Sequence, residues 1–324
     1  MFSSPTYVYL QVSRECAGCT LECYAPPDGA SLTQKEATSL VDLLWEAKVF
    51  TVLIDGGEPL LWEGIAELVE YMRKKPMVVG LVSGAEDVSQ AEALQRANLN
   101  MIQFPIEGPE EYHDSIRGEG SFQRTLEAVK TFCDLDIDTH VGTVVTPENL
   151  SYLEATSEIV SRFPVSAHRI LRYIHPTDYL NPSQCLDLLD RVYNLKKEGR
   201  KIIPNNCYTF LHLTPYKEKI NLNSFQGCVG GKTSAMITCE GYVVPCPHFA
   251  SKNLAESIDA PVIWDSDLKT IWKEWDFLTT FRNGLEKCQS CPHCTLCGGC
   301  RAAAYHVTQS LDFDPGCPLT LNKT

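Results

Sequence analysis

The chain has 324 residues, with 28 Lys or Arg against 41 Asp or Glu and a formal net charge of −13 at pH 7. This acidic balance disfavours nucleic acid as a partner, because a protein that binds a phosphate backbone needs a basic surface. No segment approaches the roughly 18 consecutive apolar residues of a transmembrane helix, so no membrane association is expected. The fifteen cysteines are unusually many, and a chain of this length does not need them as disulfide staples.

The N-terminal residues 1–16 lack a basic segment followed by an apolar run, which is the pattern of a secretory signal, and we expect a cytoplasmic protein. Clustered cysteines in a reducing compartment hold metal or carry out redox chemistry. An oxidised, secreted enzyme is the alternative. The cysteines form three groups, which are Cys16, Cys19 and Cys23; Cys228, Cys239 and Cys246; and Cys288, Cys291, Cys294, Cys297, Cys300 and Cys317. Cys133, Cys185 and Cys207 stand alone, and we expect each to be a small buried hydrophobe.

Short β-branched runs alternate with helical patterns through the first half of the chain. Six strands that alternate with helices predict a parallel sheet, which can curve into a partial (β/α)6 barrel resembling a TIM barrel. A doubly wound open sheet is the alternative. Functional residues of a barrel lie at the carboxyl ends of its strands. The six strands are expected at residues 6–12, 50–55, 77–82, 101–106, 139–146 and 167–174.

The intervening helices are predicted from apolar residues that recur every three or four positions. The first is expected to start near Ser31, and a further amphipathic helix is expected over residues 182–200. From about residue 201 the periodicity fades into turn-rich sequence, so we expect metal rather than an apolar core to order the tail. The predicted domains are a barrel over 1–180, a bridging helix and linker over 181–226, and a small cysteine-rich domain over 227–324.

The first cysteine group lies directly after the first predicted strand, with Cys16, Cys19 and Cys23 inside eight residues. Three cysteine ligands on an iron–sulfur cubane leave one iron without a protein ligand, so that a substrate or cofactor can bind there. A zinc knuckle is the alternative, but it needs a fourth Cys or His nearby.

Three motifs follow three of the predicted strands: the cysteine group, IDGGEPLL at 54–61 and EGPEEYHDSIRGEGSF at 107–122. Together they resemble the radical S-adenosylmethionine (SAM) enzymes over nearly the whole barrel. The resemblance implies a [4Fe-4S] cluster that binds SAM, whose reductive cleavage yields a 5′-deoxyadenosyl radical. It also implies an electron donor such as a flavodoxin or ferredoxin. Residues that the resemblance places at SAM are Gly56, Gly57, Glu58, Pro59, Arg117 and Tyr24.

The roles of these residues are chemically reasonable. Glycines at 56 and 57 allow a close backbone approach, Glu58 can accept from the ammonium group of SAM, and the fork of Arg117 suits a carboxylate. Two departures from the family pattern are visible. The cysteine spacing is C-x2-C-x3-C rather than C-x3-C-x2-C, and the aromatic residue expected before the third cysteine follows it instead, as Tyr24.

The C-terminal cysteines resemble the SPASM extension of the same family, which implies two auxiliary [4Fe-4S] clusters. Following that family's wiring, the first would use Cys228, Cys246 and Cys300 with Cys239 as a plausible fourth ligand. The second would use Cys288, Cys291, Cys297 and Cys317, which leaves Cys294 spare. A zinc ribbon over 288–300 is the alternative.

SPASM-containing members most often modify peptides or proteins, and a peptide side chain is the substrate that we expect. Many of them carry a leader-binding domain ahead of the barrel, which is not expected here because the first strand begins by residue 6. His248 is a weak catalytic candidate, and the catalytic residue is otherwise undetermined. The segment CGGCRAAAYHVTQSLDFDPGC resembles the tail of enzymes that trim tetrapyrrole side chains, and His168, Arg169, Arg172 and His175 could line a site for such a carboxylate-rich substrate. A small-molecule substrate of this kind and a non-enzymatic iron–sulfur electron carrier are the two alternatives.

Overall fold

The computed structural model describes residues 2–16, 18–21, 23–24, 26–209, 227–295 and 297–319. The chain forms two compact units, each assembled from separate stretches of sequence. Unit 1 comprises residues 1–105, 113–140 and 230–280, and unit 2 comprises 106–112, 141–229 and 281–324. Three elements contain residues of both units: α4 (Glu110–Arg117), β5 (Asp138–Val145) and α10 (Asp276–Asn283).

Unit 1 contains a mostly parallel sheet in the order β4-β3-β2-β1-β8-β9. Adjacent strands are parallel except β8 and β9, which are antiparallel. The strands are short apolar runs whose buried side chains are completely enclosed, such as Val8, Val52 and Phe104. Their bounds are β1 (Tyr7–Leu10), β2 (Thr51–Ile54), β3 (Val78–Val82), β4 (Met101–Pro105), β8 (Ser234–Ile237) and β9 (Val243–Val244).

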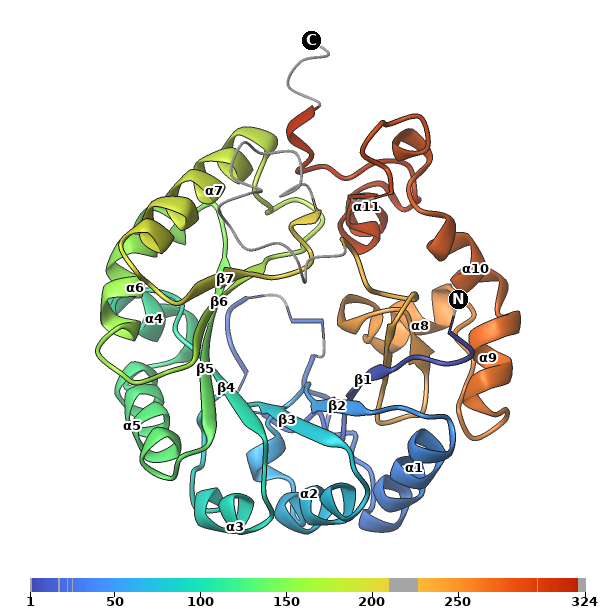
Figure 1. The fold of residues 1–324 in the computed structure, drawn as a ribbon, viewed down its shortest axis with the longest axis horizontal. Coiled ribbons are helices and arrows are strands. Elements are labelled where there is room, and N and C mark those ends of the chain that lie inside the picture. The colour runs from blue at the N-terminus through green and yellow to red at the C-terminus, as the bar shows by residue number, and fades with distance from the viewer. Residues whose placement is uncertain are drawn as a thin grey trace. The chain divides into compact units, whose positions relative to one another are not determined.

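The helices α1, α2, α3 and α5 of unit 1 all lie on one side of strands β1 to β4 (Figure 1). A doubly wound sheet would have helices on both faces, so this arrangement favours the barrel-like prediction. The helices of unit 1 are α1 (Gln34–Glu46), η1 (Pro59–Leu61), α2 (Ile65–Lys74), α3 (Ala91–Arg96), α5 (Ser121–Asp134), η4 (Pro247–Phe249), α8 (Lys252–Ser257) and α9 (Leu268–Glu274).

Helix α1 begins at Gln34, three residues after the predicted start at Ser31. Thr33 is the N-cap, because its side chain accepts from the backbone of Glu36 while Glu36 accepts from the backbone of Thr33. This reciprocal capping box satisfies two amide groups that the helix cannot bond internally. The apolar stripe that includes Leu40 and Leu44 is fully buried, as the helical spacing predicts.

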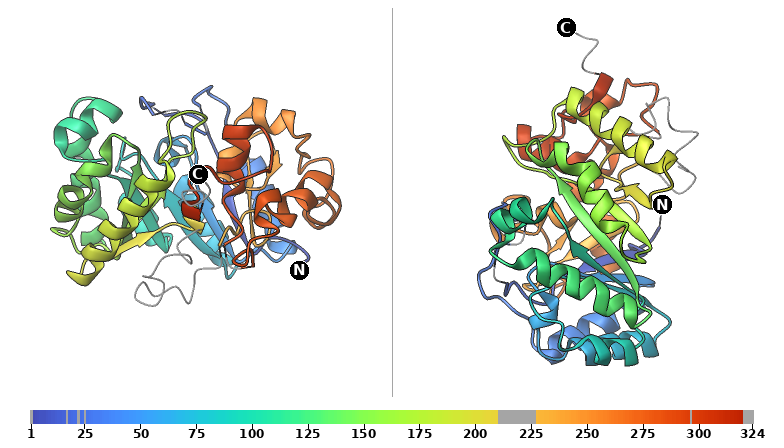
Figure 2. Two further views of the ribbon diagram at one scale, coloured as in Figure 1. Left: turned by 90° about the horizontal axis from the view of Figure 1, so that it is seen from above. Right: turned by 90° about the vertical axis from the view of Figure 1, so that its left-hand side faces the viewer.

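Unit 2 contains strands β6 and β7, which pair in parallel, and helices that pack beside them. Helix α7 lies along β7 and against α6 (Figure 2). The core of this unit includes Ile170, Leu188 and Val192, and it also includes the cysteine side chain of Cys297. The bounds are η2 (Asn149–Tyr152), α6 (Leu153–Val160), β6 (Ala167–Arg172), α7 (Pro182–Lys197), β7 (Ile202–Pro204), η5 (Glu286–Cys288) and α11 (Arg301–Thr308).

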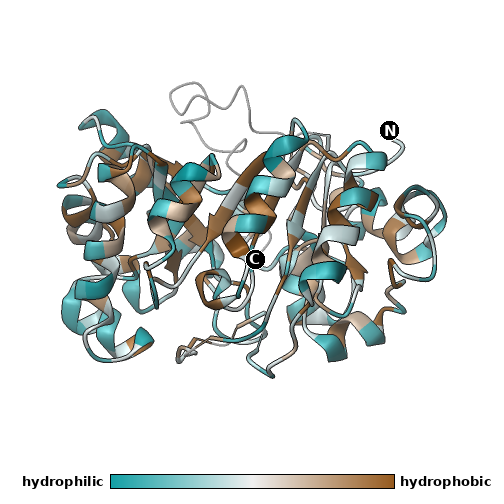
Figure 3. Cartoon of the chain, turned by 90° about the horizontal axis from the view of Figure 1, so that it is seen from below, coloured by the Kyte–Doolittle hydropathy of each residue, from teal (hydrophilic) through white to brown (hydrophobic). Residues whose placement is uncertain are grey.

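Apolar colouring follows the strands, while the helices alternate between hydrophilic and hydrophobic stretches (Figure 3). Among the described residues, no helix has both the length and the apolar character needed to cross a bilayer. Parallel strands that alternate with helices confirm the predicted α/β fold class. The tail is more regular than its sequence indicates, because β8 pairs with β1 and helices α8 to α11 follow. The proposed domain boundaries at residues 180 and 226 stay predictions, and residues 210–226 lie outside the described part.

Candidate functional site

The first cysteine group lies in the loop that follows β1, and two hydrogen bonds attach this loop to neighbouring segments of unit 1. The amide of Glu58, after β2, donates to the carbonyl oxygen of Glu15 at 2.6 Å, and the amide of Thr20 donates to that of Ile116 at 2.9 Å. The structure therefore brings the cysteine loop next to the loop after β2 and to the last turn of α4. These are the three segments whose motifs the sequence singled out.

The glycines after β2 are required by the backbone itself. Gly56 and Gly57 have φ angles of +85° and +63°, a region that other residues rarely adopt. A Cβ atom on Gly57 would also stand 2.8 Å from the Cα of Arg14 and against the carbonyl oxygen of Ser13. Gly57 therefore allows the β2 loop to lie directly on the β1 loop that carries the cysteines.

Glu58 is a buried carboxylate, only 1% exposed, at the centre of these loops. It accepts hydrogen bonds from the amide of Leu60 at 2.9 Å, the hydroxyl of Ser83 at 3.0 Å and the amide of Gly84 at 2.6 Å. Burial raises its pKa to about 7, against the partial opposition of these donors. A bound ammonium group would favour the charged form, so the carboxylate suits the role predicted for it. Pro59, the next residue, begins η1.

Tyr24, predicted to lie at SAM, is fixed by one hydrogen bond and one ring contact. Its hydroxyl donates to Asp55 at 2.6 Å, and Asp55 also accepts from the amide of Gly56 at 2.7 Å. The ring of Tyr24 meets the ring of His248 edge-on at 5.7 Å. His248 lies in η4, two residues after Cys246. Tyr24 therefore connects the cysteine loop to the first turn of the β2 loop and to the segment that carries His248.

Arg117 ends α4 and is half-buried. The turn after it is organised by Asp114, which accepts from the amides of Gly120 and Phe122, each at 2.8 Å, and from the hydroxyl of Ser121 at 3.1 Å. Sequence reasoning did not assign Asp114 a role. It lies within α4, and the N-cap residue of α5 is Gly120, so no local sequence signal marks the role of Asp114.

The four cysteines predicted for the first auxiliary cluster are divided between the units. Cys239 and Cys246 belong to unit 1, and Cys228 and Cys300 belong to unit 2, so this ligand set stays a prediction. Cys239 is buried, and its thiol donates to the side-chain oxygen of Gln11 at 3.4 Å. Burial raises the pKa of this thiol to about 12.

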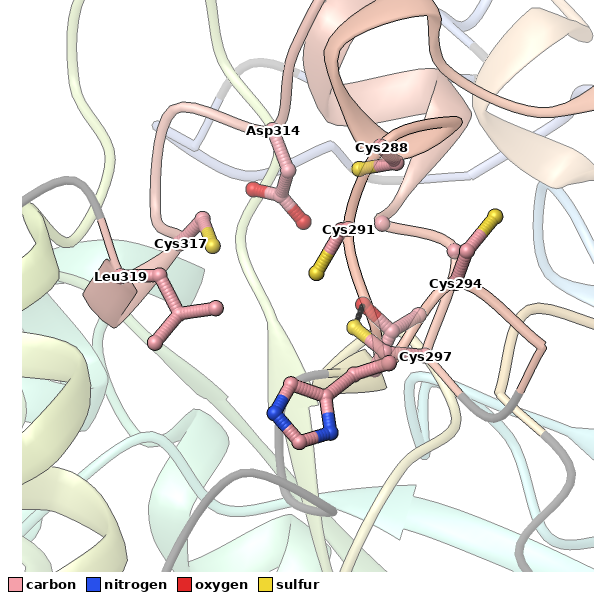
Figure 4. A pocket seen from close by; sticks show the side chains of 11 residues that line it. Cys288, Cys291, Cys294, Cys297, Asp314, Cys317 and Leu319 are labelled. Carbon is pink, nitrogen blue, oxygen red and sulfur yellow. Dashed lines mark hydrogen bonds between the residues drawn. The ribbon is translucent and has the colours of Figure 1, made fainter.

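The cysteines predicted for the second auxiliary cluster gather around one pocket inside unit 2. About 310 Å³ of space that no atom fills lies in this pocket and its opening to solvent. The thiols of Cys291, Cys297 and Cys317 point into it, whereas that of Cys294 points away (Figure 4). Its lining residues are Thr209, Cys288, Cys291, His293, Cys294, Cys297, Gly298, Gly299, Asp314, Cys317 and Leu319.

These thiols, of which Cys297 is buried and the others are half-buried, fit an iron–sulfur cluster chemically. Burial raises the pKa of Cys288 to about 12 and that of Cys317 to about 11, so both stay protonated until a cation stabilises the thiolate. Iron supplies that cation, and thiolates are the ligands of a cubane. Within the described ranges, no three His, Cys, Asp or Glu side chains are arranged around a single metal position.

A buried ion pair lies beside the pocket, and sequence reasoning missed it. The guanidinium of Arg172, at the end of β6, makes two hydrogen bonds to the carboxylate of Asp314, at 2.9 and 2.6 Å. Asp314 also accepts from the amides of Cys300 at 2.8 Å and Gly316 at 2.9 Å. Arg172 further donates to the carbonyl oxygen of Cys207 at 3.0 Å. The pair therefore fixes the backbone at Cys207, Cys300 and Gly316.

Two family models match the regions that carry these sites. The radical SAM superfamily matches residues 13–160, and an iron-sulfur cluster-binding domain named SPASM matches residues 228–300. The α/β fold and the cysteine loop at the carboxyl end of β1 agree with the first match. The chain belongs to the radical SAM superfamily and is an enzyme of that class. Within the superfamily it is a member with a C-terminal SPASM domain, so it uses iron–sulfur clusters and SAM.

Known proteins resemble the chain over most of its length. An AdoMet-dependent heme synthase of Methanosarcina barkeri is 25% identical over 335 residues, covering 93% of each chain. The mycofactocin maturase MftC of Mycobacterium tuberculosis is 26% identical over 327 residues, covering 93% of this chain and 79% of its own. The crystal structure of Streptococcus suis SuiB bound to precursor peptide SuiA has a TM-score of 0.77 at 17% identity, covering 96% of this chain and 75% of SuiB. This last similarity is one of fold.

Proposed function

We propose that the protein modifies a peptide or protein side chain by abstracting a hydrogen atom from it. When bound, SAM and the first cluster supply the radical that removes the hydrogen. The chain's own residues bind and orient SAM: Cys16, Cys19 and Cys23 hold the cluster, Glu58 accepts from the ammonium group, and Arg117 pairs with the carboxylate. Support for the peptide substrate comes from a maturase relative, MftC, and from the fold shared with SuiB, which was crystallised with its precursor peptide.

One observation separates this proposal from the tetrapyrrole alternative. A substrate with several carboxylates needs a positively charged lining, and His168 and Arg172 were two of the four predicted members. His168 is buried beside the hydroxyl of Thr143 at 2.8 Å, and burial lowers its pKa to about 4, so the ring is neutral at pH 7. Arg172 is neutralised by Asp314, with both side chains 2% exposed or less. Neither supplies unpaired positive charge to a substrate.

Tetrapyrrole modification is kept as the second candidate, because the heme synthase relative and this chain match over 93% of each other. Of the four basic residues predicted to line a tetrapyrrole site, only Arg169 and His175 are not fully buried, so this alternative has two basic side chains left for its substrate.

For the electron needed by SAM cleavage we propose a flavodoxin or ferredoxin as donor, in a reducing cytoplasm. All fifteen cysteines fall in the described part, and none forms a disulfide bond.

The test compares two substrate classes in one assay. Anaerobically reconstituted protein is reduced with dithionite and given SAM, and 5′-deoxyadenosine is quantified with a synthetic peptide library or with an iron porphyrin carrying carboxylate side chains. We expect deoxyadenosine and a peptide mass change with at least one peptide pool. The matched control is the Cys16→Ala/Cys19→Ala/Cys23→Ala variant, which should form neither product. A shift of the Soret band on tight porphyrin binding, with turnover of the porphyrin only, would overturn the peptide proposal.

A further inference from the structure

Cys207 lies outside the three cysteine groups of the sequence, yet it contacts one of their members. Its thiol donates a hydrogen bond to the sulfur of Cys300. Both residues belong to unit 2. Cys207 is only partly buried, unlike Cys185, which is fully enclosed in the core. The prediction that Cys207 is a small buried hydrophobe is therefore wrong, because Cys207 is only partly buried and its thiol contacts another thiol.

The backbone holds Cys207 in place. It lies in a turn just after β7, where its amide donates to the side-chain oxygen of Asn205 at 3.2 Å. The amide of Asn205 donates to the carbonyl oxygen of Ile170 on β6 at 2.8 Å. The adjacent Tyr208 is fully buried and its hydroxyl donates to the carbonyl oxygen of Leu171 at 3.3 Å. The turn is thus attached to a strand, as a cluster-binding position needs to be.

One ion pair holds both cysteines of this contact. Arg172 donates to the carbonyl oxygen of Cys207, and its partner Asp314 accepts from the amide of Cys300, which is the N-cap residue of α11. The ion pair therefore fixes the backbone at both cysteines, which keeps their two side chains next to each other.

We propose that Cys207 is a ligand of the same iron–sulfur cluster as Cys300. The inference rests on the proposed first auxiliary ligand set and changes its fourth member, since a fully ligated cubane takes four cysteines. Cys239, the residue that the family wiring suggests for that place, directs its thiol to Gln11 instead. On binding, the thiol of Cys207 loses its proton and its sulfur bonds to iron in place of its contact with Cys300.

The experiment uses the full chain with Cys16→Ala/Cys19→Ala/Cys23→Ala, so that the SAM cluster, which has an open iron, is absent. Into this background we place Cys207→Ala, Cys239→Ala or, as the matched control, Cys133→Ala, which removes another half-buried cysteine. The probe is ¹³C-labelled cyanide, which binds a cluster iron only where a protein ligand is missing. The readouts are iron content and ¹³C hyperfine coupling in the electron paramagnetic resonance spectrum of the reduced protein.

We expect about eight irons and no coupling in the background, since two four-iron clusters would be fully ligated. Cys207→Ala should create the ¹³C coupling or lose about four irons, while Cys239→Ala and Cys133→Ala should do neither. The same response from Cys239→Ala, with none from Cys207→Ala, would assign the fourth position to Cys239 and overturn the inference. Coupling already present in the background, and unchanged by Cys207→Ala, would also overturn it.

Cys207→Ser covers the case in which the alanine variant fails to fold. Serine preserves size and offers an oxygen ligand, so we expect the cluster to assemble with shifted g-values. A spectrum identical to that of the background would refute ligation by Cys207. Because neither readout uses a substrate, these outcomes do not depend on whether the peptide proposal holds. A background without iron would overturn the auxiliary ligand sets and this inference together.

Discussion

Unit 2 should be strongly destabilised when the ion pair between Arg172 and Asp314 loses one partner, and Asp314→Asn tests this. The substitution preserves the size of the side chain but leaves the guanidinium of Arg172 charged and buried without its counter-ion. Removing one partner of a buried pair costs about 3–5 kcal/mol of unfolding free energy. In the native pair Asp314 raises the pKa of Arg172 well above its usual value, despite burial. Without Asp314 the guanidinium still keeps its proton, because arginine is not deprotonated in proteins.

The same unit offers a matched control. Arg191 on α7 also pairs with a carboxylate: its Nη1 donates to both carboxylate oxygens of Glu154, at 3.0 and 2.8 Å. The Arg191 side chain is 31% exposed and that of Glu154 is 49% exposed. Exposed pairs contribute about 0–1 kcal/mol, so Glu154→Gln should cost little. Urea unfolding of cluster-free protein, followed by far-ultraviolet circular dichroism, measures both, because the helices of unit 2 contribute to that signal whereas all five tryptophans lie in unit 1. Equal losses of unfolding free energy for the two variants would refute the argument from burial.

Three further predictions concern the SAM site and pH. Gly57→Ala should prevent the first cluster from assembling, with about four irons lost, because the new Cβ would collide with Ser13. The control is Gly118→Ala, where φ is +93° but no atom lies within 4 Å; this variant should retain the irons of the first cluster. SAM affinity should fall as the pH drops below about 7, where Glu58 becomes protonated, and isothermal titration of Glu58→Gln should show weak binding without that dependence. Burial lowers the pKa of His113 to about 4, so an unfolded chain binds more protons between about 6.5 and 4. Stability should fall by up to about 3 kcal/mol over that range as pH is lowered, and His113→Gln should remove that slope in urea unfolding.

The regular elements of the first half could be predicted because their signals are local. Each of the six expected strands is present within a few residues, since a short apolar run between helical patterns has one way to be buried in a parallel sheet. The pairing of β8 with β1 could not be predicted. Their pairing, Tyr7 with Ser234 and Leu10 with Ile237, joins residues more than two hundred positions apart, and neither segment carries a local signal of that contact.

The residues of the candidate site also divide into those with a local sequence signal and those whose partners lie far away in the sequence. The motifs indicated Gly56, Gly57 and Glu58 because two glycines and an acidic residue stand together directly after a strand, in line with the cysteine group after the strand before it. The supporting residues Asp55 and Asp114 carry no such mark, since a single aspartate at a turn is common and its partners become visible only in three dimensions. Cys207 was assigned to the core for a similar reason: isolation in sequence says nothing about a neighbour from a distant segment.

The carboxylate of Asp314 also contacts the backbone beside ligands of both predicted auxiliary clusters. One carboxylate accepts from the amide of Cys300, a predicted ligand of the first cluster, and from that of Gly316, which precedes Cys317 of the second. Because each amide loses its charged acceptor in Asp314→Asn, both ligand loops should loosen together. We therefore expect the signals of both auxiliary clusters to weaken in parallel on titration with an iron chelator. Loss of one signal with full retention of the other would show that Arg172 and Asp314 support a single loop, and that the two clusters are held independently.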